Sequence, residues 1–145
     1  MHSKHFSLKG LVGFQKGKVN MDVGLNVLEY EASNGREFFI QAINSDNVCF
    51  GLCRCRIPFE PWRKEITKQT LLVRELHVYV KETEISEESA AVQHKGLGKQ
   101  LMQKAEELAK ANKCNKIAII SGVGVREYYR KLGYELEGAY MVKKF

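Results

Sequence analysis

The chain has 145 residues, of which 44% are hydrophobic and 28% are charged, a balance typical of one soluble globular domain. No apolar run approaches the roughly 20 residues of a membrane span, and the first ten residues lack the apolar stretch of a secretory signal. The net charge of +6 is compatible with an anionic partner such as RNA or a phosphate-rich cofactor, but a solvated basic surface would give the same value.

Strand patterns dominate the first half of the chain. Residues 1–20 are rich in glycine and lysine and have little periodicity, so we expect a poorly defined lead-in there. The residues 33–35 between two apolar stretches are a good hairpin signal. The predicted order is a strand over 23–32, a strand over 36–43, a strand over 47–57, a loop over 58–69 that holds both prolines, and the longest strand pattern over 70–80.

The second half predicts a helix followed by shorter elements. Six apolar residues recur at helical spacing on one face: Leu97, Leu101, Met102, Ala105, Leu108 and Ala109. Glu106 and Lys110 lie one turn apart on another face and are expected to pair. The predicted order is a polar loop over 81–95, this helix, a strand over 116–122, a short helix over 124–133 that ends at Gly133, and closing strands over 134–138 and 139–145.

This order of elements predicts an α/β (α+β) fold with a mixed, mostly antiparallel sheet and flanking helices. The strand–helix–strand unit over 70–121 is expected to be its parallel, right-handed part.

The cysteines predict a reducing compartment and no metal site. Cys49, Cys53 and Cys55 share one parity, so they would face the same side of a strand, while Arg54 and Arg56 would face the other side. This arrangement is typical of buried free thiols in a cytoplasmic protein. A single C-x-C without a second pair is a weak zinc signal.

Two glycines stand where the predicted helix has to begin. Gly96 and Gly98 are poor helix formers, but a helix start carries unpaired N–H groups and the positive end of the dipole. Without side chains, these positions would let a phosphate approach the main chain between Lys95 and Lys99. The Rossmann fingerprint fails because residue 101 is leucine, and the nucleotide-triphosphate loop fails because no matching upstream glycine precedes Gly98-Lys99.

The remaining pattern is Q-x-x-G-x-G, from Gln93 to Gly98, between a long strand and an amphipathic helix. In this position it resembles the acetyl-CoA pyrophosphate loop of the GNAT acetyltransferase superfamily. With "VRELHVYV" and "KIAIISGVGVREYYRKLGYELEGAYMVKKF", the chain looks like the C-terminal acetyltransferase domain of the Elongator catalytic subunit, which modifies wobble uridines in tRNA. The resemblance is strong from about residue 73 to residue 145 and looser from about residue 25. It implies a GNAT-type acetyl-CoA-binding domain over 21–145.

The resemblance also implies roles for individual residues. The strand before the loop would splay from its neighbour and hold the pantetheine arm and the acetyl carbonyl through Leu76, His77 and Val78. The pyrophosphate would be held by Gln93, Lys95, Gly96, Leu97, Gly98 and Lys99. From its spacing to Gly133, Tyr129 is the better candidate for protonating the departing CoA thiolate, and Tyr128 would contact the cofactor or pack.

Strand parity adds a candidate base. Glu75, His77 and Tyr79 would share one face of the strand, and Leu76 and Val78 the other. An amine or a water molecule that attacks an acetyl group needs a base, and Glu75 or His77 could take the proton directly or through water. The alternative is that this face is simply exposed to solvent.

Two departures from the family bear on function. The Elongator subunit has a radical S-adenosylmethionine domain with an iron–sulfur cluster ahead of this domain, and nothing in this sequence resembles it, so we expect either a fragment or a standalone relative. Many GNAT enzymes have two helices between their first two strands, where this chain has only residues 33–35. The expected partners are acetyl-CoA, tRNA, and a radical domain or Elongator-type subunits. The alternatives are a freestanding N-acetyltransferase for a protein lysine or small amine, and a non-catalytic module that binds CoA or RNA.

Overall fold

The computed structural model describes residues 22–61, 63–79 and 88–145, and of residues 88–95 it describes the backbone alone. The predicted lead-in over 1–20 therefore lies outside the described residues. The elements are β1 (Gly24–Ala32), β2 (Gly35–Ile43), β3 (Cys49–Pro58), β4 (Thr70–Val78), α3 (Glu88–Ala111), β5 (Lys116–Ile120), the 3₁₀ helix η1 (Val123–Val125), α4 (Arg126–Lys131), β6 (Glu135–Glu137) and β7 (Tyr140–Lys144).

One sheet contains all the described strands, in the order β1-β2-β3-β4-β5-β7-β6. β4 and β5 are parallel, and every other neighbouring pair is antiparallel. The predicted mixed, mostly antiparallel sheet is confirmed, and so is the parallel pair at the predicted strand–helix–strand unit. No described helix is long and apolar enough to cross a membrane.

The first hairpin forms where the turn signal predicted it. β1 and β2 pair from Ala32 with Gly35 to Gly24 with Ile43. The two residues between the strands, Ser33 and Asn34, have φ values of 50° and 65°. Two consecutive left-handed residues match the twist of antiparallel strands, so this short turn joins β1 to β2 without an intervening element.

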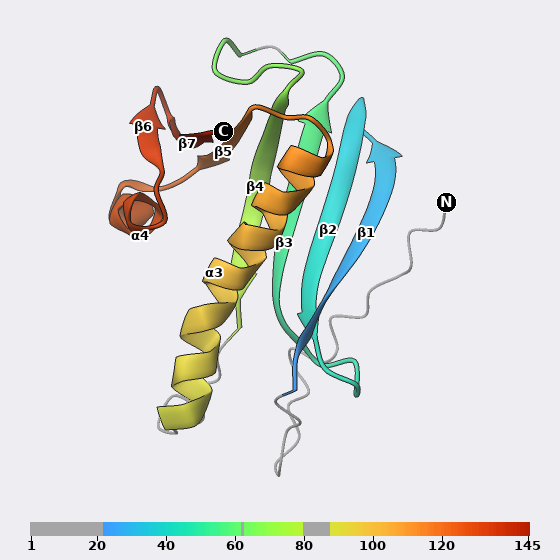
Figure 1. Ribbon diagram of the computed structural model, residues 1–145, viewed down its shortest axis with the longest axis vertical. Coiled ribbons are helices and arrows are strands. Elements are labelled where there is room, and N and C mark those ends of the chain that lie inside the picture. The colour runs from blue at the N-terminus through green and yellow to red at the C-terminus, as the bar shows by residue number, and fades with distance from the viewer. Residues whose placement is uncertain (1–21, 62, 80–87) are drawn as a thin grey trace.

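The core lies between the sheet and α3, which crosses β2, β3 and β4 on one face in Figure 1. Cys53 and Cys55 are fully buried on this side, and Arg54 and Arg56 alternate with them. All four cysteines are free and buried, and the shared parity of Cys49, Cys53 and Cys55 predicted this for the three cysteines of β3. Of the six apolar positions predicted for the helix, five are buried and Leu108 is partly buried against the same cluster.

The start of α3 was predicted wrongly. The polar loop was expected to reach residue 95, but α3 begins at Glu88 and is 24 residues long. Ala90, Ala91 and Lys95 are good helix formers, and the helix continues through Gly96 and Gly98 although each glycine costs roughly 1 kcal/mol relative to alanine. The two glycines therefore lie in the helix interior.

Candidate functional site

β4 and β5 separate after four residue pairs. β4 pairs with β5 over Thr70–Val73, opposite Lys116–Ile119. β4 then continues to Val78, whereas the chain after β5 turns into η1 and α4. Among the described residues, no strand pairs with the β5 side of β4 between residues 74 and 78.

A β-bulge marks the point of separation. On the β3 side, Cys55 pairs with Val73 but Arg54 pairs with Glu75, so Arg74 is the extra residue. A bulge bends its strand and increases the local twist, which explains why β4 leaves β5 here. The unpaired N–H and C=O groups of this edge can bind an extended chain, as the exposed edge of a sheet does in β-augmentation.

We call this region the β4 gap: the open edge of β4 at residues 74–78, near which Gly98 of α3 and Tyr128 of α4 lie. Leu76 and Val78 are half-buried and pack against the core cluster below α3. His77 lies between them on the opposite face, with a side chain that is 52% exposed. The structure therefore places these three predicted pantetheine residues along the open edge.

Gly98 of α3 meets Tyr128 of α4 at one end of the gap. A Cβ built on Gly98 would lie 2.5 Å from the Tyr128 Oη and 3.7 Å from the Val78 Cγ2. A Cβ built on Gly96 would meet only the Gln100 Nε2, at 3.9 Å. The two glycines of the motif therefore have different surroundings. Of the two, only Gly98 of α3 lies close to side chains of both α4 and β4.

The two tyrosines of α4 differ in exposure. Tyr129 is 6% exposed and makes edge contacts with the rings of Tyr128, at 5.1 Å, and Tyr134, at 6.0 Å. Burial, together with the neighbouring Tyr128 and Cys53, raises the pKa of Tyr129 to about 12. Tyr128 is 39% exposed, and partial burial raises its pKa as well. Both phenols therefore hold their protons at neutral pH.

The predicted base residues form a hydrogen-bonded group on the other face of β4. The His77 Nε2 lies 2.9 Å from the Glu75 Oε2, and the Arg54 Nη1 lies 3.6 Å from the Glu75 Oε1. The rings of His77 and Tyr79 are stacked at 6.0 Å. When Glu75 is ionised and accepts from Nε2, the neutral imidazole keeps Nδ1 as a free proton acceptor.

Arg54 was not among the predicted site residues. Its alternation with buried cysteines showed that it faces outward, but its pairing with Glu75 depends on the register of β3 against β4.

Two further buried polar atoms were not among the predicted site residues. The Ser121 Oγ and the Arg126 Nε are buried and have no hydrogen-bond partner among the described residues. Ser121 directly follows β5, and Arg126 is the first residue of α4.

The pantetheine part of acetyl-CoA fits this site better than the diphosphate part. The open edge of β4 offers unpaired backbone groups for an extended amide chain. The amides of Gly96 to Lys99, by contrast, lie in the third turn of α3, where backbone N–H groups donate within the helix. The side chains of Gln93 and Lys95 lie outside the described residues.

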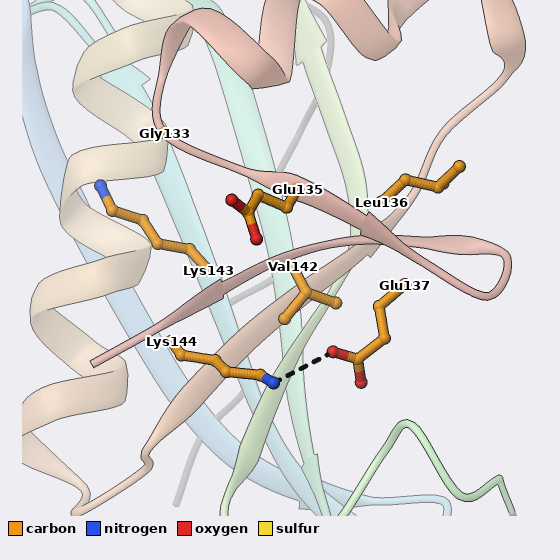
Figure 2. Close-up of a pocket in the computed structure, with 7 residues that line it drawn as sticks. All are labelled: Gly133, Glu135, Leu136, Glu137, Val142, Lys143 and Lys144. Carbon is orange, nitrogen blue, oxygen red and sulfur yellow. Dashed lines mark ion pairs between the residues drawn. The ribbon is translucent and has the colours of Figure 1, made fainter.

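A separate hollow of about 350 Å³ lies on the C-terminal hairpin (Figure 2). Glu137 pairs there with Lys144, at 3.4 Å, and with Lys116, at 3.4 Å. None of its lining residues belongs to the predicted site: Gly133, Glu135, Leu136, Glu137, Val142, Lys143 and Lys144. The charges in this hollow largely compensate one another.

Sequence comparisons identify relatives over most of the chain. A tRNA uridine(34) acetyltransferase from Methanocaldococcus jannaschii is 47% identical over 119 residues, which are 79% of this chain and 22% of the relative. Elongator complex protein 3 from Saccharomyces cerevisiae is 44% identical over 122 residues, 80% of this chain and 22% of the relative. The chain thus spans about a fifth of the length of these relatives.

Solved structures share the fold. The archaeal Elp3 from Methanocaldococcus infernus, with residues 1–46 deleted, aligns with a TM-score of 0.80 and 40% identity over 94% of this chain and 33% of that protein. A putative streptothricin acetyltransferase from Bacillus anthracis, in complex with acetyl coenzyme A, aligns with a TM-score of 0.55 and 12% identity over 92% of both chains. The model of the Acetyltransferase (GNAT) family matches residues 14–134. The chain therefore belongs to the Acetyltransferase (GNAT) family, whose members use acetyl-CoA.

Proposed function

We propose that this chain is an Elongator-type acyltransferase domain, which binds acetyl-CoA and activates or hydrolyses it for carboxymethyl modification of the wobble uridine of tRNA. The observation that carries the proposal is the open edge of β4 beside Gly98 and the tyrosines of α4, in a member of an acetyltransferase family. The names of the similar relatives, which include a tRNA uridine(34) acetyltransferase, support the choice of substrate.

The open edge of β4 would hold the pantetheine arm by backbone hydrogen bonds. Leu76 and Val78 would contact it on the side of α3, while the edge itself supplies N–H and C=O groups. Tyr128, at Gly98, would line the same gap. When bound, acetyl-CoA supplies an acetyl group activated as a thioester.

The chain can act on such a thioester from both faces of β4. Glu75 would take a proton from the attacking water or amine, directly or through the free Nδ1 of His77. Tyr129, on the α3 side, would give the proton of its Oη to the departing thiolate and recover one from solvent.

The diphosphate requires one change in α3. We propose that α3 begins near Gly96 in the cofactor complex, so that the amides of Gly96, Leu97 and Gly98 become the free N–H groups of a helix start. Two interior glycines weaken this part of the helix by roughly 2 kcal/mol in total, so residues 88–95 can leave it at modest cost. Lys99, which is exposed, would add positive charge beside the phosphates.

Water, or an acceptor held by another domain, fits this chain better than an amine held by the chain itself. The Ser33–Asn34 turn is too short to contribute an acceptor-binding lid. Partner modules, such as a radical S-adenosylmethionine domain and the tRNA it binds, would then determine the fate of the acetyl group. The competing function is acetylation of a protein lysine or polyamine by the chain alone.

Two measurements test the proposal. Acetyl-CoA at 100 times its Kd should stabilise the fold by about 2.7 kcal/mol, whereas ATP, which lacks the pantetheine arm, should not. If millimolar acetyl-CoA leaves the melting temperature unchanged, the result contradicts cofactor binding. Acetate release that rises when tRNA is added supports the Elongator-type role, and rapid acetylation of a peptide or polyamine without tRNA supports the competing function.

A further inference from the structure

Gly98 is an unexpected residue at a buried position inside a helix. Glycine weakens a helix interior relative to alanine because its backbone loses more conformational entropy on folding. Gly98 is nevertheless buried in α3, ten residues after the helix begins at Glu88. A free amide for phosphate does not explain the glycine in this helix, because the amide of residue 98 donates within α3.

The neighbours of Gly98 give a steric reason. A Cβ at this position would lie 2.5 Å from the Tyr128 Oη, closer than the 3.0 Å that real Cβ atoms keep. The next atoms are the Tyr128 Cζ, at 3.6 Å, and the Val78 Cγ2, at 3.7 Å. The tyrosine hydroxyl therefore occupies the space that any side chain on Gly98 would fill.

We propose that Gly98 is a socket for the Tyr128 hydroxyl, and that this socket positions Tyr128 beside the β4 gap. The proposal rests on the proposed function, because it concerns the same site. It adds a second reason for the glycine: the absent side chain also makes room for a tyrosine of the same chain.

The socket has a structural consequence for the gap. α4 has only six residues, and the Tyr128 ring packs edge-on against Tyr129 at 5.1 Å. The place of the Tyr128 hydroxyl at Gly98 adds a second contact that holds this exposed ring, and it links α4 to α3. Gly98 thus acts as a positioning residue for Tyr128.

A double-mutant cycle tests the socket. The variants are Gly98→Ala, Tyr128→Phe and Gly98→Ala/Tyr128→Phe, with Gly96→Ala as the matched control because only the Gln100 Nε2 lies near that position. For each we would measure the melting temperature without ligand and the Kd of acetyl-CoA by calorimetry. The ¹³Cζ resonance of Tyr128 reports directly on the environment of its hydroxyl.

We expect Gly98→Ala to weaken acetyl-CoA binding about tenfold or more and to shift the Tyr128 resonance. Adding Tyr128→Phe should restore most of this loss relative to Tyr128→Phe alone, because phenylalanine has no hydroxyl to collide with the new methyl group. Gly96→Ala should keep the resonance unchanged.

Two results would overturn the socket. If Gly98→Ala abolishes binding and Tyr128→Phe recovers none of it, the glycine serves the ligand directly. If Gly98→Ala changes neither binding nor the resonance, the hydroxyl has no fixed place. Failure of the wild type to bind acetyl-CoA would instead refute the proposed function, and the socket would still be judged by the ligand-free melting temperatures and the resonance.

Discussion

Lys143 in β7 donates a hydrogen bond of 3.1 Å to the carboxylate of Glu106 in α3, across 37 residues of sequence. The Tyr134 hydroxyl donates to the other carboxylate oxygen at 2.9 Å. The predicted pairing of Glu106 with Lys110 is therefore replaced, and the Lys110 ammonium lies over the Phe145 ring instead. Glu106 holds the C-terminal hairpin against α3.

Lys143→Met should destabilise the protein by about 1 to 3 kcal/mol, because Glu106 is largely buried and would lose its counter-charge. Lys144→Met is the matched control: this side chain is 71% exposed, and its pair with Glu137 should contribute less than about 1 kcal/mol. Urea unfolding of both variants measures the difference. Equal losses would mean that the Glu106 pair does not hold the hairpin.

Glu37→Gln should cost roughly 2 to 4 kcal/mol in unfolding free energy. The side chain of Glu37 is 3% exposed and pairs with Arg56 and Arg74, so the substitution leaves Arg56 without its buried counter-charge. Glu29→Gln breaks a pair with Arg36 that is well exposed and should change stability by less than about 1 kcal/mol. A loss for Glu37→Gln no larger than that for Glu29→Gln would contradict the assigned role.

Glu75→Gln should lower acetyl-CoA hydrolysis about 10²- to 10⁴-fold, because a positioned base contributes an effect of this size. The side chain is 38% exposed, so the melting temperature should change little. Tyr79→Phe keeps the ring that stacks on His77 and should keep most of the activity. Should Glu75→Gln hydrolyse acetyl-CoA at the wild-type rate, the base is not Glu75.

Tyr129→Phe should make the protein more resistant to alkali. The folded pKa of Tyr129, about 12, lies above the ordinary value of 10.0. The unfolded chain therefore loses this proton first, and stability that is fully present below pH 10 is lost as the pH rises toward 12. Two pKa units correspond to roughly 2 to 3 kcal/mol.

The alkaline effect can be read from urea unfolding at pH 9 and pH 11.5. Wild type should lose more stability between these values than Tyr129→Phe. Tyr134, whose pKa burial also raises, should cause part of the loss in both proteins. Identical losses would show that the Tyr129 hydroxyl is not buried as described.

Acetyl-CoA should change the hydrogen-exchange rates of two neighbouring parts of α3 in opposite directions. If the helix begins near Gly96 in the complex, amides of residues 88–95 should exchange faster and those of residues 96–99 more slowly. ATP at the same concentration is the control. Slower exchange of residues 88–95 in the complex would contradict a shortened helix.

Much of the fold follows from local pattern. The alternation of Cys53 and Cys55 with Arg54 and Arg56 predicted the two faces of β3, because side chains on a strand alternate between faces. The Ser33–Asn34 turn and Gly133, with its φ of 97°, predicted where elements end. These signals depend on neighbours in the chain, so the sequence carries them without tertiary contacts.

Other features were decided by the tertiary structure. α3 packs against β3 and β4, and such packing stabilises a helix more than local propensity does, so the glycine motif alone could not place its start. The partners of Glu106 and the bulge at Arg74 depend on how β4 and β7 register against their neighbours.

The meaning of Gly98 shows the difference most directly. From the sequence, Gly98 was interpreted as part of a helix start and a phosphate site, because a missing side chain lets a phosphate approach the free amides of a helix start. In the folded chain its missing side chain is the place of the Tyr128 hydroxyl, contributed by a helix 30 residues later in the chain. The sequence determined that position 98 has no side chain, and the packing of α4 against α3 decided what occupies the space.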